Sequence, residues 1–100
     1  MAVRYNALNI PPSVKSEAQE VLRAAVNNGE LHISLVRAFQ QPDAWGMMFV
    51  DVSRHIARLF AREKVCSEEE AFERIRTAFE TAAREPDAGV SQTTEIKDEP

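Results

Sequence analysis

The spacing of apolar residues changes along this chain, and each change predicts a different element. From Ser13 onward, apolar residues recur at helical spacing. They are Val14, Ala18, Val21, Leu22 and Ala25. Ser16 and Gln19 have the spacing of a capping box, and the Asn27–Gly29 segment supplies residues that end helices in left-handed backbone. This pattern predicts a first helix between Ser13 and Asn27.

The next segment, "LHISLVRAF", alternates with a period of two residues and predicts a strand over Leu31–Phe39. One side would carry Leu31, Ile33, Leu35 and Phe39, and the other His32, Ser34 and Val36. A single strand leaves its backbone groups unpaired, so it needs a neighbour. Residues 2–10, which precede Pro11 and Pro12, are expected to be extended and to supply one neighbour. A second subunit could supply the other.

The longest helical pattern begins at Pro42 and continues to about Lys64. Its large apolar side chains gather on one side: Trp45, Met48, Phe49, Val52, Ile56, Leu59 and Phe60. A strip of small residues lies beside them: Gly46, Ser53, Ala57 and Ala61. The small strip predicts that a second backbone packs closely there. Because only a narrow sector is polar, we expect this helix to be the central element of the fold, covered on two sides.

A third helix is predicted to begin at Ser67, whose side chain can cap it, with Glu70 at the capping-box position. Its expected buried stripe consists of Phe72, Ile75, Ala78, Phe79 and Ala82. Glu70–Arg74 and Glu80–Arg84 are expected ion pairs on its wet side. The helix is expected to end at Pro86, Asp87 and Gly89.

Together these elements predict an α+β fold in one small domain over residues 1–89. The expected order is (β)-α-β-α-α, with one or two strands packed on the central apolar helix. The remaining residues, 90–100, lack a core-forming pattern and are predicted to be a disordered acidic tail.

Composition narrows the class of protein. With 100 residues, 44% apolar and 28% charged, the chain is typical of a soluble single domain. Its N-terminal residues contain no apolar run that predicts a signal peptide or a membrane span, and Cys66 is a lone cysteine. We therefore expect a cytoplasmic protein with no membrane partner.

Charge bears on the partners of the chain. The net charge of −4 disfavours nucleic acid, whose phosphates it repels. The charge is uneven, because residues 1–64 carry eight basic and six acidic side chains and residues 65–100 carry four and ten. The acidic C-terminal part is therefore able to neutralise arginines of the second helix.

Asp51 and His55, one turn apart on the second helix, are the candidate catalytic residues. They could form a general base or a ligand-binding pair. The structural interpretation, a hydrogen-bonded histidine at the border of the apolar face, is favoured because no third catalytic partner is evident. His32 on the strand could approach this pair as a metal-binding set, but two histidines without a spacing motif are a weak signal. We predict no metal and no cofactor.

Arg54, Arg58 and Arg62 follow one another at four-residue spacing and, with His32, are the candidate ligand-binding residues. Such a stripe could contact phosphate or nucleic acid. No aromatic residues interleave with the arginines as base stacking requires, so a solvated or salt-bridged face is favoured.

Several motifs of this chain resemble a family of short bacterial proteins known as a domain of unknown function. They are "NIPP", "LHISL", "AWG", Asp51 and "RHIA", and the resemblance covers roughly residues 7–87. The chain departs from the family pattern near Ala25, where an aromatic residue is expected, and in a slightly short strand-to-helix link. The resemblance implies a small bacterial α+β domain and brings no activity with it.

These observations favour a non-catalytic homodimeric interaction or scaffold module, with an unknown protein partner left open. The dimer would be joined through the Leu31–Phe39 strand or the small strip of the central helix. One alternative is a small anionic-ligand-binding protein or an enzyme that uses Asp51, His55 and Arg58. A second alternative is nucleic-acid binding through Arg54, Arg58 and Arg62.

Overall fold

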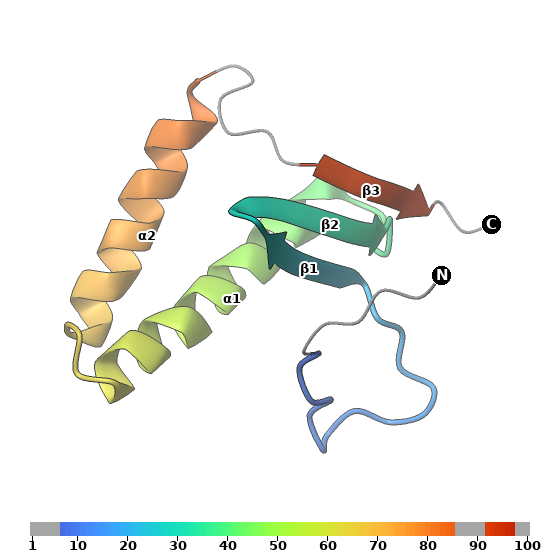
Figure 1. The fold of residues 1–100 in the computed structure, drawn as a ribbon, viewed down its shortest axis with the longest axis horizontal. Helices are drawn as coiled ribbons and strands as arrows, with labels where there is room; N and C mark the ends of the chain where they lie inside the picture. Colours follow the sequence, from blue (N-terminus) through green and yellow to red (C-terminus); the bar gives the residue numbers. More distant parts are fainter. Residues whose placement is uncertain (1–6, 86–91, 98–100) are drawn as a thin grey trace.

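The computed structural model describes residues 7–85 and the backbone of residues 92–97. The elements follow in the order β1 (Leu22–Asn27), β2 (Glu30–Val36), α1 (Pro42–Arg62), α2 (Glu68–Ala83) and β3 (Gln92–Lys97). Figure 1 shows a three-stranded sheet beside a pair of helices. The predicted α+β class is confirmed, with a different order of elements.

The sheet is built around β2, which lies between β1 and β3. β1 is antiparallel to β2, and β3 is parallel to it. Asn28 and Gly29 connect β1 to β2 with φ angles of 54° and 79°. Positive φ at both positions is what a two-residue hairpin of type I′ requires. The Asn-Gly pair is therefore a hairpin turn and not the end of a helix.

The first predicted helix is wrong, and the reason lies in the residues of β1. Leu22, Ala24 and Val26 alternate along the strand and pair with Leu35, Ile33 and Leu31 of β2. This pairing satisfies the backbone of β2, which a helix at the same position would leave open. Upstream of β1, turns close at the hydrogen bonds Val14 N–H to Pro11 O and Ala18 N–H to Lys15 O.

The described part of the N-terminal segment, residues 7–10, does not supply the predicted neighbour of β2. Residues 7–10 are not in a strand, and residues 2–6 lie outside the described part of the chain. Leu8 and Ile10 are 94% and 76% exposed. At the other end, the backbone of β3 falls within residues 90–100, where the sequence predicts disorder; the rest of that range lies outside the described residues.

The two long helices confirm their predictions. α1 begins at Pro42, with Asp43 in its first turn, and ends at Arg62, after which Lys64 has φ 61°. Before α2, the Oγ of Ser67 accepts a hydrogen bond of 3.0 Å from the backbone N–H of Glu70, as the capping pattern predicts. The acidic residues in the first turn of α2 lie at the positive end of the helix dipole, and this placement stabilises the helix.

α1 and α2 pack through small side chains. Ala57 is 0% exposed and Ala71 is 4% exposed, and they are the buried apolar residues of the described chain. The second backbone predicted on the small strip is therefore α2. Figure 1 shows the two helices diverging away from their connection. Ala78, Phe79 and Ala82 of the predicted buried stripe consequently lie exposed.

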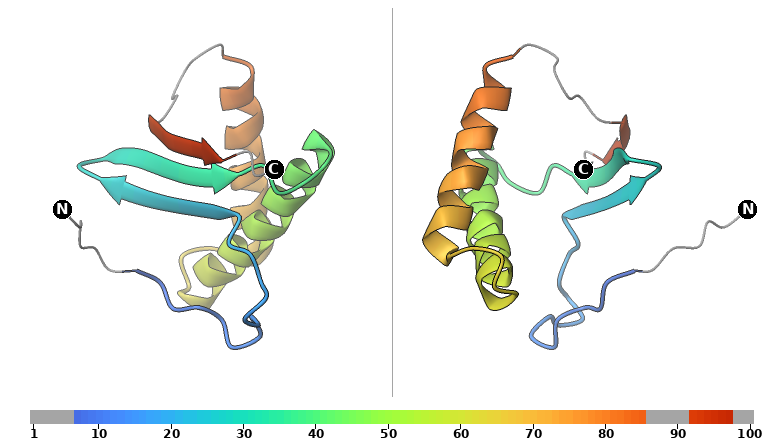
Figure 2. Two further views of the ribbon diagram at one scale, coloured as in Figure 1. Left: turned by 90° about the vertical axis from the view of Figure 1, so that its right-hand side faces the viewer. Right: turned by 60° about the vertical axis from the view of Figure 1, so that its left-hand side comes forward.

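The prediction that α1 is central and covered on two sides is wrong. Among the described elements, α1 packs on α2, and the strands pack on one another, but neither helix packs closely on the sheet. The two views of Figure 2 show the sheet standing to one side of the helix pair.

Candidate functional site

Asp51 and His55 lie one turn apart on the outer surface of α1. The Nε2 of His55 is 3.6 Å from the Oδ2 of Asp51, so the predicted pair forms. The side chain of His55 is 65% exposed and that of Asp51 is 74% exposed. Water reaches both groups, and an ion pair in such a position contributes at most about 1 kcal/mol. A general base also needs a substrate site within hydrogen-bond reach, and the hollow described below, beside β1, is lined by neither residue.

His32 lies on β2, apart from the Asp51–His55 pair. Its Nε2 is 3.8 Å from the Oε1 of Glu30, the first residue of the same strand. Within residues 7–85, no three His, Cys, Asp or Glu side chains lie close enough to hold a metal ion. The structure therefore does not bring His32, His55 and Asp51 together.

The three arginines of α1 do not present one continuous basic stripe. Arg54 places its guanidinium 4.4 Å from the centre of the Phe72 ring of α2, a cation–π contact. The Nε of Arg58 is 3.4 Å from the Oε2 of Glu68, also on α2. Arg62 lies in the last turn of α1. Two of the three side chains thus tie α1 to α2, as the salt-bridged interpretation expects.

On the wet side of α2, the expected Glu70–Arg74 pair forms at 3.8 Å. Glu80 pairs at 3.0 Å with Arg76 and not with the expected Arg84, which lies just after the last residue of α2. Arg76 also contacts Glu73 at 2.7 Å, and the hydrogen bond and charge of Glu73 raise the pKa of Arg76. These ion pairs lie in water on the exposed side of α2.

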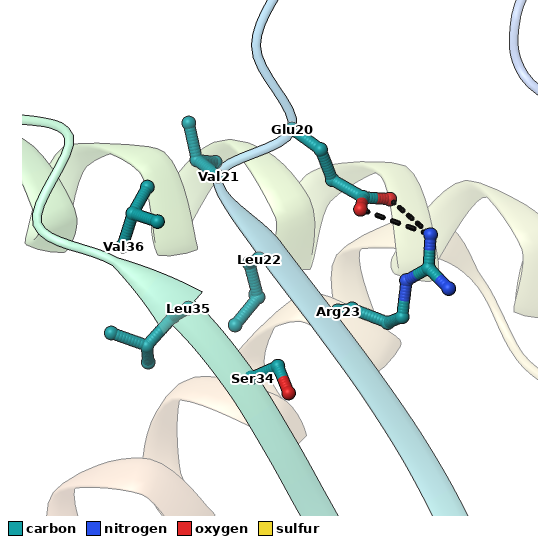
Figure 3. Close-up of a pocket in the computed structure, with 7 residues that line it drawn as sticks. All are labelled: Glu20, Val21, Leu22, Arg23, Ser34, Leu35 and Val36. Carbon is teal, nitrogen blue, oxygen red and sulfur yellow. Dashed lines mark hydrogen bonds and ion pairs between the residues drawn. The ribbon is translucent and has the colours of Figure 1, made fainter. Parts of the chain in front are cut away.

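A hollow of about 310 Å³ lies where the chain enters β1, shown in Figure 3. It is lined by Glu20, Val21, Leu22, Arg23, Ser34, Leu35 and Val36. The Nη2 of Arg23 is 3.0 Å from the Oε1 of Glu20, so the two charges in the hollow are paired with each other. The remaining lining is mostly aliphatic. Sequence reasoning missed this hollow because it depends on the pairing of β1 with β2.

The apolar side of α1 is partly exposed to solvent along the helix. We call its exposed part the large face, which consists of Phe49, Val52, Ile56, Leu59 and Phe60. These side chains are 38–47% exposed. At the N-terminal end, Trp45 is half-buried, with its ring 5.1 Å from Phe39 in an edge-on arrangement and 6.1 Å from Phe49. Contiguous apolar surface of this kind is typical of an interaction site.

Comparisons with known proteins give a family and a structural relative. A solved structure from the photosynthetic bacterium Rhodopseudomonas palustrus CGA009, provisionally described as a pyruvate dehydrogenase, is 44% identical to this chain. The match covers 85% of this chain and 90% of that one, with a TM-score of 0.69. A search of curated proteins found none that matches. In the described residues, no helix has the length and apolarity needed to cross a membrane.

The family model described as "Domain of unknown function (DUF5076)" matches residues 7–87. This range runs from the exposed N-terminal segment through β1, β2 and α1 to just beyond α2. The chain therefore belongs to the DUF5076 family.

Proposed function

We propose that this chain is a non-catalytic, homodimeric interaction module of the cytoplasm. The observation that carries the proposal is the large face of α1, whose side chains remain 38–47% exposed. Complete burial of an aliphatic or aromatic side chain stabilises by about 1.5–3 kcal/mol. Covering the exposed part of the large face on both chains would therefore contribute roughly 6–12 kcal/mol. That is the range needed to offset the cost of association, about 4–15 kcal/mol.

The surfaces that sequence analysis offered for the dimer are used within the chain. β2 has β1 on one side and β3 on the other, so its edges are occupied. The small strip of α1 is covered by α2 at Ala57. The large face is the surface of α1 that remains, and we assign the dimer contact to it.

We propose no catalysis, because the candidate acid–base residues, Asp51 and His55, are exposed to water. The Asp51–His55 pair is exposed on both sides. Arg58, the third member of the anionic-ligand alternative, is engaged by Glu68. The activity in the printed name of the Rhodopseudomonas protein belongs to that protein, and the exposed Asp51–His55 pair gives no reason to extend it to this chain.

Sedimentation velocity at rising protein concentration tests the proposal. We expect the wild-type chain to sediment at twice its monomer mass of 11.2 kDa at tens of micromolar. Val52→Asp places a charge on the large face and should leave a folded monomer. Met47→Asp is the matched control, since Met47 is exposed on the opposite side of the same helix and should leave the dimer intact. A wild-type monomer at all concentrations would remove the proposal.

A ligand screen separates the proposal from its rivals. If the chain were an anion-binding protein, phosphate or carboxylates would raise its melting temperature, and His55→Ala would abolish the rise. If it bound nucleic acid, a retarded band would form at low salt and vanish at high salt. The proposal expects neither effect.

A further inference from the structure

We propose that the outer edge of β1 binds an extended segment of a partner protein, which adds to the sheet as a further strand. The segment that fits this edge has aliphatic residues at alternate positions and lysine or arginine between them. The edge belongs to the sheet and not to the large face of α1, so its function does not depend on the proposed homodimer.

The hydrogen bonding of the hairpin determines which backbone groups of β1 face outward. The N–H of Val36 donates to the carbonyl of Val21 at 3.2 Å, so these two residues form a hydrogen-bonded pair. In an antiparallel ladder, hydrogen-bonded and non-hydrogen-bonded pairs alternate. Leu22, Ala24 and Val26 therefore belong to non-hydrogen-bonded pairs with β2. Their N–H and C=O groups point away from β2, along the outer edge of the sheet.

This outer edge has no partner among the described residues. β1 is the first strand of the sheet, with β2 beside it (Figure 1). Within residues 7–85, no backbone hydrogen bond from outside the strands reaches Leu22, Ala24 or Val26, and no described helix packs on β1. Val26 is 74% exposed. The outward N–H and C=O groups thus form a row, at two-residue spacing, to which a further strand can bond.

β1 also lacks the features with which proteins prevent strand addition. Those features include proline, lysine and β-bulges on the edge strand. The strand sequence "LRAAVN" contains neither proline nor lysine, and its pairing with β2 is regular throughout. Its one charged residue, Arg23, has its Nη2 3.0 Å from the Oε1 of Glu20. β1 is therefore a regular edge that accepts an extended chain, the mode of recognition called β-augmentation.

The side chains of β1 indicate the apolar part of the partner segment. An added strand places every second side chain on the same face of the sheet as Leu22, Ala24 and Val26, which are all aliphatic. Aliphatic residues at alternate positions of the segment therefore suit this face. The hollow at the start of β1 has a mostly aliphatic lining and can take one of these side chains (Figure 3).

Charge indicates the residues between them. Glu20 precedes β1, and Glu30 is opposite Asn27, the last residue of β1. Arg23 offsets the charge of Glu20. The charge left beside the edge is negative, as is the net charge of the chain, −4. Lysine or arginine between the aliphatic residues of the segment is therefore favoured over aspartate or glutamate.

Amide hydrogen exchange followed by NMR tests the edge residue by residue. In the free chain, the outward amides of Ala24 and Val26 should exchange faster than the amide of Ala25, which belongs to a hydrogen-bonded pair with β2. The probe is a short peptide, acetylated and amidated at its ends, in which lysine and valine alternate. At about nine times its Kd, the peptide should slow the exchange of Ala24 and Val26 about tenfold, because only the unbound fraction exchanges.

Ala24→Pro removes the central outward N–H of the edge. The ladder with β2 should survive, because Ala24 does not bond to β2 and proline is accepted on edge strands. Ala24→Val is the matched control, since it also enlarges the side chain but keeps the N–H. We expect the peptide to bind the wild type and Ala24→Val equally and Ala24→Pro at least about tenfold more weakly. Circular dichroism checks that both variants are folded.

The opposite results would overturn the inference. Slow exchange of Ala24 and Val26 without peptide would mean that the edge is already covered, by the same chain if the rate is independent of protein concentration and by a second copy if it is not. Unchanged exchange at saturating peptide, or equal binding of the peptide to Ala24→Pro, would mean that the edge does not accept a strand. Equal binding of a peptide with glutamate in place of lysine would remove the charge preference. Sedimentation measures the homodimer separately from all of these.

Discussion

Enlarging Ala57 is predicted to force α1 and α2 apart. Ala57 is 0% exposed, and Ala71 of α2 is 4% exposed, so the two backbones approach through side chains of one carbon each. Leucine at position 57 adds three carbons where no space exists. Overpacking of this kind costs about 1–3 kcal/mol of stability. For a domain of this size, each kcal/mol lowers the melting temperature by about 4–8 °C.

Gly46→Ala is the matched control, because Gly46 belongs to the same small strip of α1. A Cβ built at Gly46 meets nothing within 4 Å. Alanine is favoured over glycine inside a helix by about 0.5–1 kcal/mol. We therefore expect Ala57→Leu and Gly46→Ala to shift stability in opposite directions.

Thermal and urea unfolding followed by circular dichroism measure both changes. All samples should have one protein concentration, because the stability of a dimer depends on it. A neutral Ala57→Leu would refute the packing of α2 on the small strip. A destabilising Gly46→Ala would show that another chain or segment covers Gly46.

Substitutions at three further positions test single contacts. His55→Ala should lower the free energy of unfolding by less than about 1 kcal/mol, since its contact with Asp51 is exposed; a much larger loss would mean that the imidazole is buried in the assembly. Ser67→Ala should cost about 1 kcal/mol through loss of the cap to Glu70, and Ser67→Asp should restore it; equal melting temperatures would argue against the cap. Arg54→Ala should cost about 0.5–1 kcal/mol, and Arg54→Lys less, because the contact with the Phe72 ring is cation–π. An equal loss in both Arg54 variants would assign the effect to the planar guanidinium.

The elements that the sequence predicts correctly are those whose signals are local. α1 and α2 have long apolar stripes at helical spacing, and Ser67 stands where a cap is needed. β2 alternates over seven residues. In each case the period and the end signals agree, so the element is decided without knowledge of its neighbours.

The segment before β2 could not be decided in that way. "LRAAVN" satisfies the helical period through Leu22 and Ala25 and the strand period through Leu22, Ala24 and Val26. The pairing with β2 decides between them, and this pairing joins residues that are not neighbours in sequence. Asn28-Gly29, a strong hairpin signal, was the local feature that favoured the strand.

The residue pattern of one helix also cannot predict which element covers its apolar side. The apolar side of α1 shows which residues avoid water, and it does not show whether a sheet, a helix or a second chain covers them. The Asp51–His55 pair was predictable because both members lie on one helix. The hollow beside β1 was not, because Val21 and Val36 meet there only after the hairpin has formed.

Small-angle X-ray scattering can show whether the large face joins two chains, because it reports the mass and the radius of gyration together. We predict that the wild type scatters with twice the mass of 11.2 kDa. We also predict that the Val52→Asp monomer has a radius of gyration close to 15.5 Å. A wild type that scatters with the mass of a single chain at tens of micromolar would contradict the homodimer.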